Sequence, residues 1–149
     1  MHFVRIAFGT DEVTPLTEEL VAGLPDRGHQ VVVVGAGEPW PEVGRRVALA
    51  VSRGEADLGL VLCWTGTGVS IAANKVPSVR AALCTDAETA AGARRYNDAN
   101  VLALSLRLTS SALAWEMVDA FVTGEVDHQA RPLIDRLEMA LQLPSDTLG

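Results

Sequence analysis

Short apolar runs alternate with stretches of helical character along most of the chain, and this alternation limits the possible folds more than any other feature. Five runs have the length and apolar content of buried strands. They are Val4–Phe8, Val31–Val34, Leu58–Cys63, Val79–Cys84 and Asn100–Ser105. The run Val31–Val34 is entirely β-branched, which predicts a strand covered on both faces.

The segments between these runs have the marks of helices. Pro15 opens one that carries apolar residues at i, i+4 spacing, and Gly28 and His29 end it. The others are Val43–Val51 after a loop at Gly35–Pro41, Val69–Asn74, Asp86–Arg95, a helix capped by Thr109 that runs to Phe121, and a tail at Asp127–Leu141 interrupted near Pro132. This spacing predicts a single doubly wound α/β domain over residues 1–149, with helices on both faces of a five-stranded parallel sheet and a helical tail at about 127–143.

Composition excludes several classes of function. The formal net charge is −7, and an acidic surface repels phosphate backbones, so we expect no nucleic-acid partner. No apolar run has membrane-spanning length and the first residues lack a signal-peptide pattern, so we expect a cytoplasmic protein with no membrane association. Two cysteines, Cys63 and Cys84, are too few for a disulfide framework or a four-cysteine metal site. We expect Cys84 to pack as a small buried thiol.

The loop Cys63–Ser70 runs from a predicted strand into a predicted helix and contains two glycines. Ligands in such sheets bind beyond the carboxyl ends of the strands, where this loop and Gly9–Thr14 lie. Free amides at a helix N-terminus attract anions, and a thiol in that field can act as a base. An enediolate is an anion that such amides would stabilise. The alternative is a simple turn beside a buried thiol. The loop lacks the Gly-Lys-Ser/Thr ending of a phosphate-binding Walker loop and also lacks a GxGxxG pattern.

Motifs spread over nearly the whole chain resemble those of ribose-5-phosphate isomerase B and the related galactose-6-phosphate isomerases. They are Gly9–Asp11, Gly54–Asp57, Cys63–Lys75, Arg80–Asp86, Asn97–Leu102 and His128-Gln129. The resemblance implies a Rossmann-like domain in a homodimer or dimer of dimers, with active sites at the subunit interface and no metal or nucleotide cofactor. Members with glutamate at position 69 form a sister group, and Val69 places this chain with the cysteine type.

The resemblance also implies roles for individual residues. Cys63 would move a proton between the two carbons of the enediol, while Thr65 and the amides of Gly66, Thr67 and Gly68 would hold the enediolate, with Ser70 in the same binding loop. Asp11 and Asn97 would bind sugar hydroxyls. The alternatives are a loop-end cap for Asp11 and a turn residue for Asn97.

Two acidic residues stand where the family binds phosphate. Glu12 replaces a histidine, and Asp127 replaces the first arginine of the tail motif. His128, Arg131 and Arg107 match the remaining phosphate-binding positions. A lost charged hydrogen bond weakens binding about tenfold or more. The alternative is that both carboxylates face solvent.

Two aromatic residues also depart from the family. Tyr96 stands at the position of the ring-opening histidine, and its ordinary pKa near 10 makes it a poor proton shuttle. Trp64 replaces a glycine directly after the cysteine and would reshape the pocket or stack on the ligand. An interface position for Tyr96 and an outward-facing Trp64 are the alternatives. The family's Asp-Tyr-Pro loop is shortened here to Pro39-Trp40-Pro41.

These observations predict a cofactor-free aldose–ketose isomerase that works through a cis-enediol or enediolate with Cys63 as the base. Its small-molecule substrate would be a pentose, a hexose or a sugar phosphate held by a weakened phosphate site. Two alternatives remain: a non-catalytic or hetero-oligomeric partner subunit of a sugar isomerase, and a related epimerase.

Overall fold

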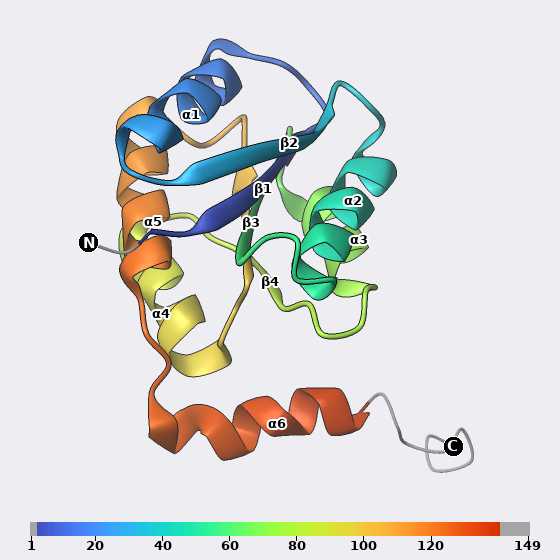
Figure 1. The fold of residues 1–149 in the computed structure, drawn as a ribbon, viewed down its shortest axis with the longest axis vertical. Coiled ribbons are helices and arrows are strands. Elements are labelled where there is room, and N and C mark those ends of the chain that lie inside the picture. The colour runs from blue at the N-terminus through green and yellow to red at the C-terminus, as the bar shows by residue number, and fades with distance from the viewer. Residues whose placement is uncertain (1–2, 141–149) are drawn as a thin grey trace.

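The computed structural model describes residues 3–140 and contains a parallel sheet at its centre (Figure 1). The strands are β1 (Arg5–Thr10), β2 (Gln30–Ala36), β3 (Leu58–Cys63), β4 (Ala81–Leu83) and β5 (Val101–Ser105). Their order across the sheet is β2-β1-β3-β5-β4, and every pairing is parallel. Cys63 pairs with Ser105 and Thr10 pairs with Leu62, so the carboxyl ends of the three central strands meet at one edge.

Helices cover both faces of the sheet, which confirms the predicted α/β class (Figure 1). They are α1 (Pro15–Asp26), α2 (Trp40–Ser52), α3 (Thr67–Asn74), α4 (Ala87–Asn97), α5 (Ser111–Thr123) and α6 (Arg131–Ala140), with a short 3₁₀ turn, η1, at His128–Ala130. Helices α1, α4 and α5 lie on one face and α2 and α3 on the other, while α6 extends along one end of the domain. Within residues 3–140, no helix is both long and apolar enough to cross a bilayer.

The alternation of side chains along β3 divides the core between the two faces. Leu60 and Leu62 pack with the α1, α4 and α5 face, whereas Val61 and Cys63 pack with α2 and α3. Burial of each such leucine contributes about 1.5–3 kcal/mol. Cys63 therefore ends its strand on the side where α3 begins.

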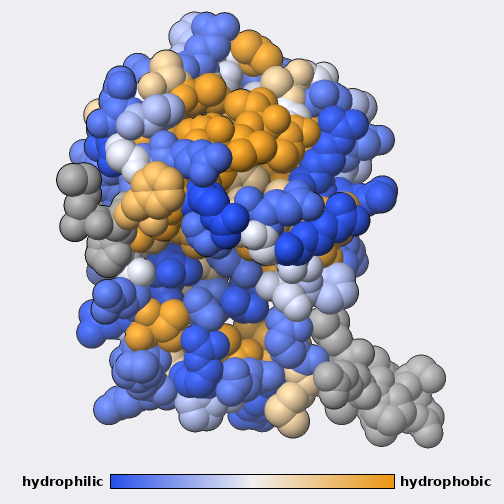
Figure 2. Space-filling model, in the orientation of Figure 1, coloured by the Kyte–Doolittle hydropathy of each residue, from blue (hydrophilic) through white to orange (hydrophobic). Residues whose placement is uncertain are grey.

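The prediction that Val31–Val34 is covered on both faces is wrong. These residues belong to β2, which lies at the edge of the sheet, and Val32 and Val33 are 42% and 47% exposed. Figure 2 shows the apolar patch that results over this strand. A β-branched run favours a strand but does not determine the strand's place in the sheet.

Two predicted helix starts also need correction. Ser110, not Thr109, caps α5, because its hydroxyl accepts a hydrogen bond from the Leu113 amide at 3.2 Å. Helix α2 begins at Trp40, inside the predicted loop, where a proline suits the first turn. The predicted tail consists of η1 and α6, which meet between Ala130 and Arg131, next to Pro132. The predicted end of the tail, 141–143, lies outside the described residues.

Candidate functional site

Cys63 lies at the carboxyl end of β3, immediately before the glycine turn. Its side chain is 5% exposed, and its sulfur accepts a hydrogen bond from the Gly66 amide at 3.2 Å. Gly66 has φ +78, in the left-handed region, and a Cβ there would lie 2.9 Å from the carbonyl carbon of Leu104. Both constraints require glycine at this position. The turn therefore holds a main-chain donor against the thiol.

Helix α3 begins directly at this turn and supplies further donors. Gly66 is its N-cap and provides no side-chain cap, so the first amides of the helix, those of Thr67 and Gly68, have no acceptor within it. The hydroxyls of Thr65 and Thr67 are 2.8 Å apart. Ser70 lies one turn further along, where its amide bonds to the Gly66 carbonyl. A thiol and free main-chain donors thus lie together, an arrangement suited to an anion that forms beside a base.

The end of β5 supports this loop from the neighbouring strand. The Ser105 hydroxyl donates to the Trp64 carbonyl at 2.9 Å, and the Arg107 amide donates to the same oxygen at 3.0 Å. The Leu106 amide donates to the Cys63 carbonyl at 2.9 Å. Arg107 is thereby placed beside the loop, and its side chain is exposed. Ser105 was not among the residues predicted for the site, although its position at the end of a strand was a usable signal.

Asp11 follows β1 and reaches the same edge of the sheet. Its amide donates to the carbonyl of Leu62, the residue before Cys63, at 3.3 Å. Its Oδ1 atom is buried without a hydrogen-bond partner. Burial raises the pKa of the Asp11 carboxyl, and the neighbouring Glu12 raises it further. A buried acceptor without a partner is costly and suits a hydroxyl group supplied by a ligand.

Glu12 lies beside Asp11 and is exposed. The Thr10 hydroxyl donates to the Glu12 carbonyl at 2.6 Å, which fixes the loop main chain. The Glu12 carboxylate therefore lies on the rim of the Cys63 end, close enough to influence Asp11 electrostatically.

Four predicted site residues lie at the opposite end of the sheet: Tyr96, Asn97, His128 and Arg131. Helix α4 starts after the carboxyl end of β4 and returns to the amino end of β5, so its last residues, Tyr96 and Asn97, lie far from Cys63. The strand β5 between them spans roughly 13 Å at an ordinary rise per residue. His128 and Arg131 lie next to this end of α4, since Arg131 Nη2 contacts Asp98 at 3.0 Å. One chain does not bring the two groups of residues together.

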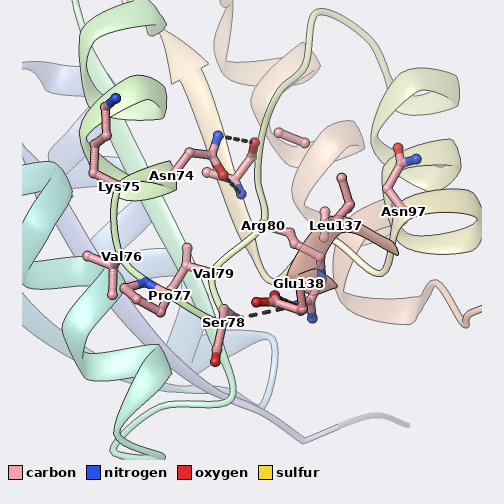
Figure 3. A pocket seen from close by; sticks show the side chains of 13 residues that line it. Asn74, Lys75, Val76, Pro77, Ser78, Val79, Arg80, Asn97, Leu137 and Glu138 are labelled. Atoms are coloured by element: carbon pink, nitrogen blue, oxygen red, sulfur yellow. Dashed lines mark hydrogen bonds and ion pairs between the residues drawn. The ribbon is translucent and has the colours of Figure 1, made fainter. Parts of the chain in front are cut away.

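The amino end of the sheet has its own cavity. About 450 Å³ in volume, it lies between the end of α3, the segment before β4, the end of α4 and α6 (Figure 3). Lys75, Arg80 and Asn97 are among its polar lining residues, and Leu137 closes it from α6. Asn97 thus borders a hollow in which polar ligands or another chain could be accommodated.

Asp127 has a local structural role. Its carboxylate accepts a hydrogen bond from the Gln129 amide at 3.0 Å and caps η1. This contact favours the alternative in which Asp127 does not face a phosphate pocket. Tyr96 is exposed, with the Arg95 guanidinium 5.7 Å from the centre of its ring.

Two tryptophans flank the Cys63 loop. Trp64 is 55% exposed, which leaves it available for a ligand or a second subunit. Trp40, in the first turn of α2, packs against Gly68 so closely that a Cβ on Gly68 would lie 2.9 Å from its ring. Trp40 was predicted only as part of a shortened loop, because a contact between segments 28 residues apart has no local signal.

Cys84 differs from Cys63 in its surroundings. It is buried on the opposite face of the sheet, and burial together with Asp86 raises the pKa of its thiol to about 11. A thiol of this kind stays protonated at neutral pH and packs as an apolar group. Among residues 3–140, no group of three or more His, Cys, Asp or Glu side chains is placed to hold a metal ion.

Comparison with known proteins gives a consistent result. Residues 6–137 match the family described as Ribose/Galactose Isomerase. The chain is 41% identical to ribose-5-phosphate isomerase B of Escherichia coli over 135 residues, covering 85% of this chain and 91% of that protein. It is 38% identical to galactose-6-phosphate isomerase subunit LacB of Clostridium acetobutylicum over 125 residues, covering 80% and 72%. The structure of ribose-5-phosphate isomerase B from Clostridium thermocellum superposes with a TM-score of 0.88 at 37% identity, covering 93% and 97%.

Proposed function

Because this chain belongs to the ribose/galactose isomerase family, we propose that it interconverts an aldose and a ketose with Cys63 as the base, without a metal or nucleotide cofactor. The observation that carries this proposal is the Gly66 amide 3.2 Å from the Cys63 sulfur, at the N-terminus of α3. A main-chain donor and a helix terminus stabilise negative charge that develops on a substrate beside the sulfur. The base and the anion site thus share one loop.

The reaction follows from this arrangement. The Cys63 sulfur takes the proton from C2 of an open-chain aldose and returns it to C1 of the enediolate, which gives the ketose. In the same exchange, the proton on the C2 hydroxyl moves to the C1 oxygen. Thr65 and the amides of Gly66, Thr67 and Gly68 stabilise the negative charge that develops on oxygen. The buried Oδ1 of Asp11 accepts a hydrogen bond from a substrate hydroxyl.

The complete site requires two chains in this proposal. Cys63 and Asn97 lie at opposite ends of one sheet, which supports a dimer in which each Cys63 loop meets the far end of the partner subunit. Tyr96, Asn97, His128 and Arg131 would then act on the substrate bound at the partner's Cys63 loop. The exposed Trp64 supports a covering subunit there.

The substrate's anionic group would be held by few cations. Arg107 is placed at the Cys63 end, and His128 and Arg131 would come from the partner. Glu12 on the rim opposes a phosphate. Substrates to compare are ribose 5-phosphate, galactose 6-phosphate and the corresponding free sugars, each in both directions.

A mixing experiment tests the base and the shared site together. Cys63→Ala and Arg131→Gln proteins should each be inactive or nearly so, and subunit exchange between them should restore activity. Random exchange makes half the dimers hybrid, each with one intact site, so about a quarter of wild-type activity should return. Cys84→Ala mixed with Arg131→Gln serves as the control for subunit exchange alone. A Cys63→Ala protein that keeps more than about a tenth of wild-type turnover would exclude Cys63 as the base.

The similarity to a subunit named LacB keeps one alternative in view, a chain that works with a second, homologous chain. The wild-type protein, purified alone, distinguishes the two. Turnover by the isolated protein supports the homomeric enzyme. If the isolated protein is inactive and adding a second family member from the same cell restores activity, the result supports the partner subunit.

A further inference from the structure

Asp98 lies at the end of α4 as its C-cap, with φ 48 in the left-handed region. Its carboxylate contacts three guanidinium groups from three parts of the chain. Arg131 of α6 approaches within 3.0 Å, Arg80 before β4 within 3.4 Å, and Arg94 of α4 within 3.7 Å. The Asp98 side chain is 22% exposed. One carboxylate thus joins α6 to the body of the domain.

We propose that Asp98 is a positioning residue that holds the Arg131 guanidinium ready for the anionic group of the substrate. This rests on the proposed function, in which Arg131 reaches the substrate in the partner's site. Arg80 and Arg94 hold Asp98 in place through its main chain: Arg80 Nε donates to the Asp98 carbonyl at 2.7 Å, and the Asp98 amide donates to the Arg94 carbonyl at 3.2 Å.

Exposure separates the three arginines. The side chains of Arg80 and Arg94 are 21% and 17% exposed, and both have other partners, Glu138 and the Ala99 carbonyl. Arg131 is 44% exposed. Of the five N–H donors of its guanidinium group, one at Nη2 binds Asp98, so most of the guanidinium donors stay available for a ligand. Asp98 therefore orients Arg131 without occupying it.

Removal of Asp98 would leave Arg131 poorly held. Three guanidinium groups share the Asp98 carboxylate, Glu138 also contacts Arg80, and Arg131 is the most exposed of the three cations. Without Asp98, Arg131 keeps only the exposed Asp135, at 3.8 Å on its own helix, and faces two like charges. A long cation that is already fixed loses less conformational freedom when it binds.

The test is Asp98→Asn, because asparagine matches aspartate in size and tolerates the left-handed backbone. Inhibition by inorganic phosphate and the kinetics of ribose 5-phosphate are measured on the folded protein. We expect the phosphate inhibition constant and KM to rise about tenfold, as for the loss of about 1.4 kcal/mol, while kcat changes less than about twofold. Asp135→Asn is the matched control and should change neither constant more than about twofold.

A double-mutant cycle shows whether Asp98 acts through Arg131. In an Arg131→Gln background, Asp98→Asn should have no further effect on phosphate binding. An equal effect in both backgrounds, no effect in either, or tighter phosphate binding in Asp98→Asn would overturn the proposal. If Asp98→Asn does not fold, Arg131→Lys replaces it: a lysine cannot use the fork, and phosphate binding as tight as in wild type would overturn the role of an oriented guanidinium.

The outcomes for the wild-type protein separate this inference from the proposed function. Turnover of a free sugar without any phosphate binding would support the isomerase and overturn the role of Asp98. Phosphate binding without turnover would remove the isomerase and leave the binding constants of the variants to decide on Asp98. Absence of both would overturn both.

Discussion

The Gly66 amide donates a hydrogen bond to the Cys63 sulfur across 3.2 Å, so the turn that ends β3 also contacts the residue expected to carry the proton. The amide can bond to the sulfur only because Gly66 adopts φ +78, which returns the chain toward the strand it has just left. Fold and chemistry therefore depend on the same turn.

Replacing Gly66 with alanine should damage both stability and turnover. A Cβ at this position would lie 2.6 Å from Leu83 Cδ1 and 2.9 Å from the Leu104 carbonyl carbon. We expect a loss of about 2–4 kcal/mol in the free energy of unfolding, measured by urea titration. Gly54→Ala is the matched control, since Gly54 has φ +75 but no atom within 4 Å of its would-be Cβ, and it should lose only about 1 kcal/mol. Equal losses in the two variants would show that strain alone matters at position 66.

The two cysteines should respond differently to alanine substitution. Cys63→Ala should lower kcat about 10²–10⁴-fold with the fold intact, because it removes the base. Cys84→Ala should leave kcat unchanged and reduce stability by about 1 kcal/mol, because a protonated buried thiol only packs. Deuterium exchange from solvent into the sugar, followed by NMR, measures the first effect, and thermal unfolding measures the second. Loss of exchange in Cys84→Ala would contradict this assignment.

Asp11 should make stability depend on pH in an unusual direction. Its pKa is raised in the folded protein, so the folded state binds the proton more tightly than the unfolded chain does. The resulting stabilisation is fully present below the ordinary aspartate pKa and is lost as the pH rises through the raised value. Asp11→Asn should therefore be more stable than wild type at pH 7 and should lack this loss, while its KM rises about tenfold. Thermal unfolding between pH 4 and 7 measures the difference, with Glu12→Gln expected to remove part of the effect. A constant difference between wild type and Asp11→Asn across this range would refute it.

The acidic residue at position 12 should weaken phosphate binding. We expect Glu12→His to tighten ribose 5-phosphate binding by about 1.5–3 kcal/mol in calorimetry, as one restored charged contact would. Asp127→Asn is the control: asparagine can still cap η1 as Asp127 does, and loss of this charge should change phosphate binding little. Tight wild-type binding, or no gain in Glu12→His, would place the Glu12 carboxylate outside the pocket.

The strand runs and the alternation were readable from the sequence because burial on a sheet requires apolar residues in short runs. The position of β2 within the sheet could not be predicted, because Val31–Val34 would have the same sequence pattern at the centre of the sheet or at its edge. Strand order depends on which helices pack beneath the sheet, and no single segment encodes it.

The positions of some residues of the candidate site could be predicted from the sequence, and those of others could not. Cys63 ends a strand and Asp11 and Thr65 follow strands, so their meeting at one edge was predictable. Asn97 precedes β5, so chain direction places it at the other end of the sheet. Arg131 follows the last strand and reaches that end through its contact with Asp98. The packing of Trp40 on Gly68 and the contacts of Asp98 are long-range, and only the folded chain shows them.

The separation of Cys63 from Arg131 along one sheet has an evolutionary consequence. In the proposed dimer, where two subunits share each site, one copy can after a gene duplication lose the residues at one end of its sheet and still serve the other copy with those at the opposite end. Once the other copy has lost the complementary residues, selection preserves both genes as an obligate pair, although neither product needs a new surface. An enzyme built this way can become a two-gene enzyme through losses alone, and the first loss is silent as long as the intact copy is expressed beside it.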